Sequence, residues 1–131
     1  MLVALDACSS GLALPNSLNR FLNEEELVEF RQLSIIENDV REKARNILVA
    51  GTKDQDALYV NGGIFTNALI NGLKGYADMN NDDIIQFREL VLYVRNMTVA
   101  EARQRGERQE PDSNKYERYG DGEIMFLISQ E

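Results

Sequence analysis

Residues 1–11 read MLVALDACSSG, and this stretch decides the fold. The apolar run over residues 1–5 has the length of a strand, and such a run before small residues is typical of a fully buried strand in a parallel sheet. Asp6 and Cys8 follow it directly. Catalytic and ligand-binding groups of parallel α/β sheets gather beyond the carboxyl ends of the strands. The stretch therefore predicts a functional site at that edge.

Outward from this strand, apolar runs and helical spacings alternate along the chain. They predict helices after Asn23 and over residues 38–45, a strand over 46–51, helices over 64–72 and 90–105, a polar loop over 104–122 and a last strand over 124–128. Alternating strands and helices predict a layered α/β fold. With 131 residues, the whole span 1–131 is expected to belong to one domain.

The charge balance excludes one class of partner. The chain has 22 acidic and 14 basic residues and a net charge of −8, so its surface repels nucleic-acid backbones and favours cationic partners. No apolar run is long enough to cross a bilayer, so no membrane partner is expected. Cys8 is the single cysteine, which leaves a free thiol and favours a reducing, cytoplasmic location.

Cys8 is a candidate nucleophile. The thiolate is the reactive form, and it needs a base or a positive field to exist near neutral pH. The small residues around Cys8 would keep the thiol open to a substrate. The alternative is an inert, buried cysteine that packs as a small apolar side chain. Chemistry alone leaves both interpretations open.

The motif DACSSG over residues 6–11 resembles the cysteine motif of metacaspases and bacterial caspase-like peptidases. Four further segments resemble later parts of that family in the family's order. They are ILVAGTKDQDA over 47–57, GGIFTNAL over 62–69, QEP over 109–111 and EIMFL over 123–127. Together they are spread along residues 2–127, from one end of the chain nearly to the other.

The resemblance implies a cysteine endopeptidase and assigns its residues. The chain would be the C-terminal part of a caspase-like α/β/α sandwich with a mostly parallel sheet, lacking its N-terminal strands. Cys8 would be the nucleophile and its N–H an oxyanion donor. Asp6 would line the pocket that selects Arg or Lys before the scissile bond; alternatively it only caps the loop after its strand. Substrate would pair with the segment 51–56, whose binding residues are Gly51, Thr52, Lys53 and Asp54.

One catalytic group of this family has no counterpart in the chain. A Cys–His peptidase uses an imidazole as base and acid, and the sequence contains no histidine. We therefore expect the histidine to lie on a missing N-terminal half of the domain, and this chain alone to be inactive. The chemistry requires no cofactor. The expected partners are that half and peptide or protein substrates with basic residues.

A second motif lies at residues 78–89, which read DMNNDDIIQFRE. It resembles an EF-hand calcium loop, with ligands at positions one, three, five, seven, nine and twelve. These positions hold Asp78, Asn80, Asp82, Ile84, Gln86 and Glu89. Ile85 fills the apolar eighth position, whereas Asp83 replaces the usual glycine at the sixth. The alternative is a run of side-chain-to-backbone turns that cap the next helix.

Three functions remain open from the sequence. The first is the peptidase, here as an incomplete domain. The second is a non-catalytic protein that keeps a caspase-like scaffold for binding. The third is a calcium-responsive binding module in which Cys8 is incidental.

Overall fold

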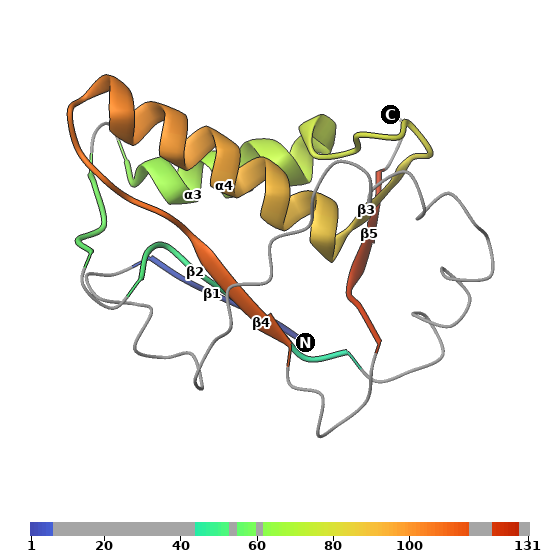
Figure 1. Ribbon diagram of the computed structural model, residues 1–131. Helices are drawn as coiled ribbons and strands as arrows, with labels where there is room; N and C mark the ends of the chain where they lie inside the picture. The colour runs from blue at the N-terminus through green and yellow to red at the C-terminus, as the bar shows by residue number, and fades with distance from the viewer. Residues whose placement is uncertain (7–43, 53–54, 60–61, 116–121, 129–131) are drawn as a thin grey trace.

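The computed structural model describes residues 1–6, 44–52, 55–59, 62–115 and 122–128 (Figure 1). They form a mixed α/β structure, as the alternating pattern predicts. The elements in chain order are β1 (Leu2–Leu5), β2 (Asn46–Val49), α3 (Ile64–Asn71), the short π-helix η2 (Gly72–Tyr76), β3 (Ile84–Gln86), α4 (Phe87–Gln104), β4 (Asp112–Lys115) and β5 (Met125–Leu127).

The described strands form two small sheets. The larger sheet has the order β1-β2-β4, with β1 parallel and β4 antiparallel to β2. The second sheet pairs β3 with β5 antiparallel. Helices α3 and α4 lie side by side across one face of the larger sheet (Figure 1). The carboxyl ends of β1 and β2, the start of α3 and the end of α4 all lie at one end of the molecule.

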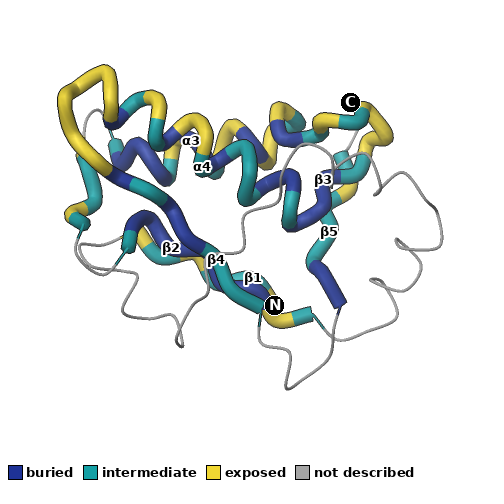
Figure 2. Tube along the Cα trace, viewed as in Figure 1, coloured by how far each residue is buried: buried dark blue, intermediate teal, exposed yellow. Residues whose placement is uncertain are grey.

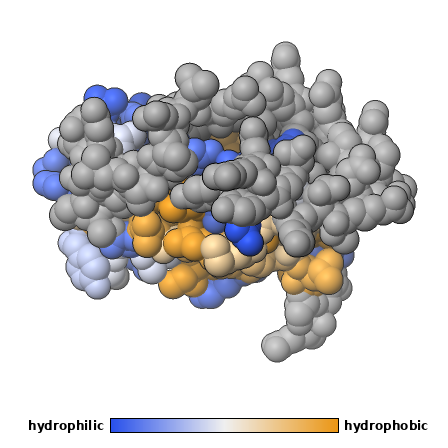
Figure 3. All heavy atoms as spheres, turned by 90° about the horizontal axis from the view of Figure 1, so that it is seen from below, coloured by the Kyte–Doolittle hydropathy of each residue, from blue (hydrophilic) through white to orange (hydrophobic). Residues whose placement is uncertain are grey.

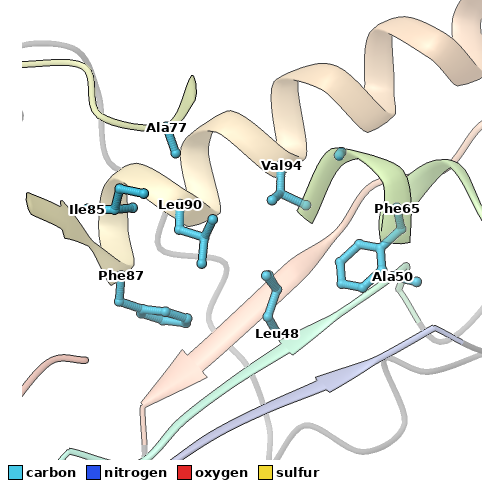
Figure 4. Packing of buried hydrophobic residues seen from close by; sticks show 9 residues of the cluster. Leu48, Ala50, Phe65, Ala77, Ile85, Phe87, Leu90 and Val94 are labelled. Carbon is cyan, nitrogen blue, oxygen red and sulfur yellow. The ribbon is translucent and has the colours of Figure 1, made fainter. Parts of the chain in front are cut away.

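The main core fills the space between this sheet and the two helices (Figure 4). Alternate residues of β2 point towards the helices because side chains alternate across a strand. The buried side chains that meet there come from β2, α3, α4 and the segment between the helices: Leu48, Ala50, Phe65, Ala68, Ala77, Ile85, Phe87, Leu90 and Val94. This packing determines where the carboxyl end of β2 and the start of α3 lie.

The other residues of β2 belong to the opposite face of the sheet. Ile47 and Val49 are buried there, and Val3 and Leu5 of β1 pack against them half-buried. Apolar side chains are visible on the face seen from below (Figure 3), and β2 is buried along its whole length (Figure 2). Strands β1 and β2 therefore place apolar side chains on both faces of the sheet, as expected for a layered α/β fold.

Helix α4 begins with a capping interaction between Gln86 and Glu89. Its N-cap residue, Gln86, is extended, and the Glu89 carboxylate accepts the Gln86 backbone N–H at 3.0 Å. A glutamate in the first turn also stabilises the positive end of the helix dipole. The helix therefore starts at Phe87, three residues before the predicted start at Leu90.

Three expectations from the sequence need correction or lie outside the description. Residues 104–122 are not all loop, because β4 pairs with β2 through its backbone despite its polar sequence, DSNK. Strand β1 is half-buried rather than fully buried, since it ends the described sheet and pairs only with β2. The predicted helices after Asn23 and over 38–45 fall almost wholly outside the described residues.

Candidate functional site

Asp6 occupies the predicted place at the carboxyl end of β1. Its side chain is exposed, and its Oδ2 accepts a hydrogen bond from the Thr66 hydroxyl at 2.5 Å. Thr66 lies in the first turn of α3, where the helix dipole favours a carboxylate. A Cβ on Gly63, the N-cap of α3, would collide with Oδ2. The glycine therefore makes room for Asp6, and the helix end fixes the direction of its carboxylate.

The segment that leaves β2 starts beside Asp6. The Ala50 N–H donates to the Leu5 carbonyl at 2.8 Å, which brings the two strand ends together. Gly51 is buried and Thr52 half-buried. Thr52 is bonded locally: its carbonyl accepts the Gln55 N–H at 3.1 Å and its own N–H approaches Gln55 Oε1 at 3.4 Å. Asp6, Gly51 and Thr52 thus share one edge of the sheet, as the sequence predicts.

Gln109 ties this segment to the chain that follows α4. Its side chain is buried, with 1% of its surface exposed. Its Nε2 donates to the Ala50 carbonyl at 2.9 Å, and its Oε1 accepts the Leu58 N–H at 2.7 Å. Gln55 adds a second tie, because its Oε1 accepts the Glu110 N–H at 2.8 Å. Two glutamine amides therefore join segments more than fifty residues apart in sequence.

An open hollow of about 440 Å³ lies between these two segments. Thr52, Gln55, Asp56 and Leu58 line one side of it, and Glu107 and Arg108 line the other. Asp56 and Glu107 are exposed carboxylates, while Arg108 forms an ion pair with Glu110 at 3.5 Å. The hollow thus adjoins the proposed substrate segment and carries mixed charge.

Three predicted site residues lie outside the described residues: Cys8, Lys53 and Asp54. Two side chains that sequence reasoning missed act at this edge. Thr66 gave no signal beyond its place in a helix start, and Gln55 was one polar residue among several. Gln109 stood out only within the QEP segment, which said nothing of its contacts.

The acidic loop 78–89 has the backbone that its sequence predicts. Asp83, at the sixth position, has φ +63°, and Asn81 has φ +57°. This left-handed conformation is the one a glycine would adopt most easily there. Ile85 is fully buried, and β3 pairs it with Phe126 of β5. The loop is therefore sharply turned and anchored in the core.

Side-chain oxygens of the loop accept backbone N–H groups of the same loop. Asp78 accepts from Asp82 at 3.2 Å and from Asp83 at 3.0 Å. Asn80 accepts from Asp82 at 3.1 Å, and Asp82 accepts from Ile84 at 2.9 Å. These bonds are the side-chain-to-backbone turns of the alternative interpretation. They precede α4, so both interpretations describe part of the arrangement.

Glu89, at the twelfth position, is buried with 2% of its surface exposed. Burial raises the pKa of its carboxyl group, and the charges of Asp82 and Asp78 raise it further, while backbone N–H groups of Gln86 and Met79 oppose that change. The acidic side chains therefore lie close enough to repel one another. The donor types and their order suit calcium, yet among the described residues no three acidic, histidine or cysteine side chains are arranged to hold a metal ion.

The two candidate regions lie at opposite ends of α4 (Figure 1). The acidic loop leads into its first residue, and Gln109 follows soon after its last. The helix has 18 residues, which at about 1.5 Å each separates its ends by about 27 Å. The described residues contain no helix long and apolar enough to cross a membrane.

Comparison with known proteins adds no relative. We found no family model, no curated protein and no solved structure that matches this chain significantly.

Proposed function

We propose that this chain is the cysteine-bearing part of a caspase-like peptidase that cleaves after Arg or Lys. The observation that carries the proposal is Asp6. Its exposed carboxylate is held at the carboxyl end of β1 by Thr66, two residues before Cys8 in the sequence. A fixed carboxylate at an open sheet edge binds a guanidinium or ammonium group through charge-assisted hydrogen bonds. The net charge of −8 favours the approach of basic substrates.

The reaction would follow from these roles. The Cys8 thiolate attacks the carbonyl carbon of the scissile bond, and the Cys8 N–H stabilises the oxyanion. An imidazole first takes the thiol proton and then gives it to the leaving amine. Water hydrolyses the thioester and restores the thiol. No residue of this chain supplies the imidazole, because the chain has no histidine.

The proposed domain is therefore completed by a second stretch of polypeptide. We propose that this histidine-bearing half extends the sheet beyond β1 and completes an α/β/α sandwich. Strand β1 ends the described sheet, and its residues are only half-buried or exposed. The apolar second face of the sheet supports the sandwich. A free thiol nucleophile suits a reducing, cytoplasmic setting.

The test is cleavage by the completed domain. The chain is joined to a histidine-bearing half, and kcat/KM is measured on fluorogenic peptides that differ only in Arg, Lys or Asp before the scissile bond. We expect cleavage after Arg and Lys and none with Cys8→Ala. Asp6→Asn should lower kcat/KM for Arg by about 100-fold, since a charged hydrogen bond is lost from a site with few others.

Glu101→Gln is the matched control, because Glu101 is a half-exposed carboxylate on α4 that pairs with Arg105 and neither lines the hollow nor belongs to the segment 51–56. It should leave the preference for Arg unchanged. Equal loss in both variants would remove Asp6 from the pocket. A folded, completed domain that cleaves none of the peptides would favour the alternative in which the scaffold only binds other proteins.

A second candidate function is calcium binding by residues 78–89, favoured by the left-handed backbone of Asp83 at the sixth position. The ligands would be the carbonyl of Ile84 and the side-chain oxygens of Asp78, Asn80, Asp82, Gln86 and Glu89. Calcium would replace the hydrogen bonds that these carboxylates now accept. Titration of the chain by calorimetry should show one site, and Glu89→Gln should weaken it about tenfold or more. Glu101→Gln serves again as the control, and equal affinities of the chain and Glu89→Gln would exclude this loop.

A further inference from the structure

Gln109 has the contacts of a residue that positions the substrate segment. It lies outside that segment, yet the two ends of its amide bond to Ala50 and Leu58, which lie on either side of it in the sequence. Its Nε2 bonds to the first residue beyond β2, Ala50, and its Oε1 bonds to Leu58. A buried amide with both ends satisfied holds its partners in one geometry, because leaving either backbone group unpaired in the interior is costly.

The bond to Ala50 connects Gln109 with the strand that carries Asp6. Ala50 gives its N–H to the Leu5 carbonyl at 2.8 Å and its carbonyl to Gln109 at 2.9 Å. The Ala50 peptide groups are therefore held from both sides, by β1 and by the segment after α4. A substitution that removes the Gln109 amide would therefore free Ala50 and Leu58 to move relative to Asp6, although Gln109 itself bonds to neither β1 nor Asp6 in the bonds described.

The same amide sets the width of the hollow. Glu107 and Arg108, which directly precede Gln109, form one wall. The other wall consists of Thr52, Gln55, Asp56 and Leu58. Gln55 bonds to the Glu110 N–H from this second wall. The two glutamines together fix the distance between the walls.

We infer that Gln109 is a positioning residue of the proposed peptidase, which holds Ala50 and Leu58 in place relative to β1 so that substrate meets Asp6 and the hollow in register. The inference rests on the proposed function. It assigns Gln109 no contact with substrate. It predicts that changes at Gln109 raise KM, while the reaction of bound substrate at Cys8 is little affected.

The first test uses the completed domain and three variants. Gln109→Met keeps the side-chain length but removes donor and acceptor. We expect KM for the Arg peptide to rise about 10-fold or more with kcat nearly unchanged, because small misplacements of binding groups cost one to two orders of magnitude. Val94→Ala is the control, since Val94 is equally buried and the two hydrogen bonds of the Gln109 side chain do not involve it. It should lower the unfolding midpoint without changing KM.

The second test uses Gln109→Glu as a conservative rescue. A neutral carboxyl group has one O–H donor and one carbonyl acceptor, so it can replace both hydrogen bonds of the amide, whereas the carboxylate cannot donate. Burial favours the neutral form. The ratio of the KM of Gln109→Glu to the KM of the unchanged domain, measured at the same pH, should approach one at acidic pH. This ratio should rise as the pH increases. Gln109→Met should show no such profile.

The outcomes separate this inference from the proposed function. Cleavage after Arg with a KM that neither Gln109 variant alters would overturn the role of Gln109 and leave the peptidase standing. Equal loss of kcat in Gln109→Met and Val94→Ala would reduce Gln109 to a stabilising residue. A completed, folded domain without peptidase activity would overturn both proposals.

Discussion

The sheet edge around Asp6 and the acidic loop 78–89 are both polar, but they are held together differently. At the sheet edge, Asp6, Gln55 and Gln109 bond to groups more than fifty residues away. In the loop, the side chains of Asp78, Asn80 and Asp82 accept hydrogen bonds from backbone groups no more than five residues away. Local bonds form wherever the local sequence permits them. The bonds of the sheet edge exist only after the whole core has assembled.

The largest effect on stability should come from Ile85, the residue that anchors the acidic loop in the main core. Ile85 is buried in the core that also holds Leu48. Ile85→Ala should lower the free energy of unfolding by about 2–5 kcal/mol, measured by urea denaturation, because it leaves a cavity. Ile70→Ala is the control, since Ile70 is 46% exposed on α3, and its cost should be far smaller. Equal small costs would make the loop an independent module.

The hydrogen bond between Asp6 and Thr66 can be broken by a substitution at Gly63, which lies next to the Asp6 carboxylate. Gly63→Ala places a Cβ against Asp6 Oδ2, so the carboxylate must turn away and lose Thr66. The backbone of Gly63 is unstrained for alanine, with φ −62°. We expect a loss of about 1 kcal/mol in unfolding free energy. In a double-mutant cycle this loss should vanish in the background Asp6→Ala; a loss that persists there would place its cause elsewhere.

The left-handed turn of the loop gives an effect of opposite sign. Asp83 has φ +63°, which costs a residue with a Cβ more than it costs glycine. Asp83→Gly should therefore raise the unfolding free energy by up to about 1 kcal/mol. Asp83→Ala should lower the unfolding free energy. Thermal and urea denaturation of both variants should therefore show a gain in stability for glycine and a loss for alanine. A stabilising alanine would contradict the left-handed conformation.

The smallest effect should be the pH dependence of Glu89 in metal-free buffer. The folded-state pKa of its carboxyl group is raised, chiefly by burial. A carboxyl group of this kind stabilises the fold below its unfolded-state pKa, and this contribution is lost as the pH rises through the folded-state value. The chain should therefore lose stability relative to Glu89→Gln over a pH range that begins near the ordinary glutamate pKa of about 4 and extends upwards. A constant difference across that range would contradict the raised pKa.

The features that could be predicted from the sequence are those that depend on residues close to one another along the chain. The apolar runs located β1 and β2, the spacing of Phe65, Ala68 and Leu69 located α3, and the loop pattern placed Asp83 in a turn and Ile85 in the core. Asp6 was placed at the end of its strand for the same reason. In each case the residues that cause the structure lie within one or two turns of it, where hydrophobic period and turn chemistry act.

The remaining features depend on contacts between residues far apart in the sequence, so they became apparent only in the tertiary structure. Strand β4 has a polar sequence and is a strand because β2 offers it backbone partners. The burial of β1 depends on how many strands flank it. Thr66, Gln55 and Gln109 could not be assigned to the sheet edge from the sequence, because a glutamine looks the same in a loop as in a buried amide bridge. Their partners become neighbours only through the packing of α3 and α4 on the sheet, which no local pattern records.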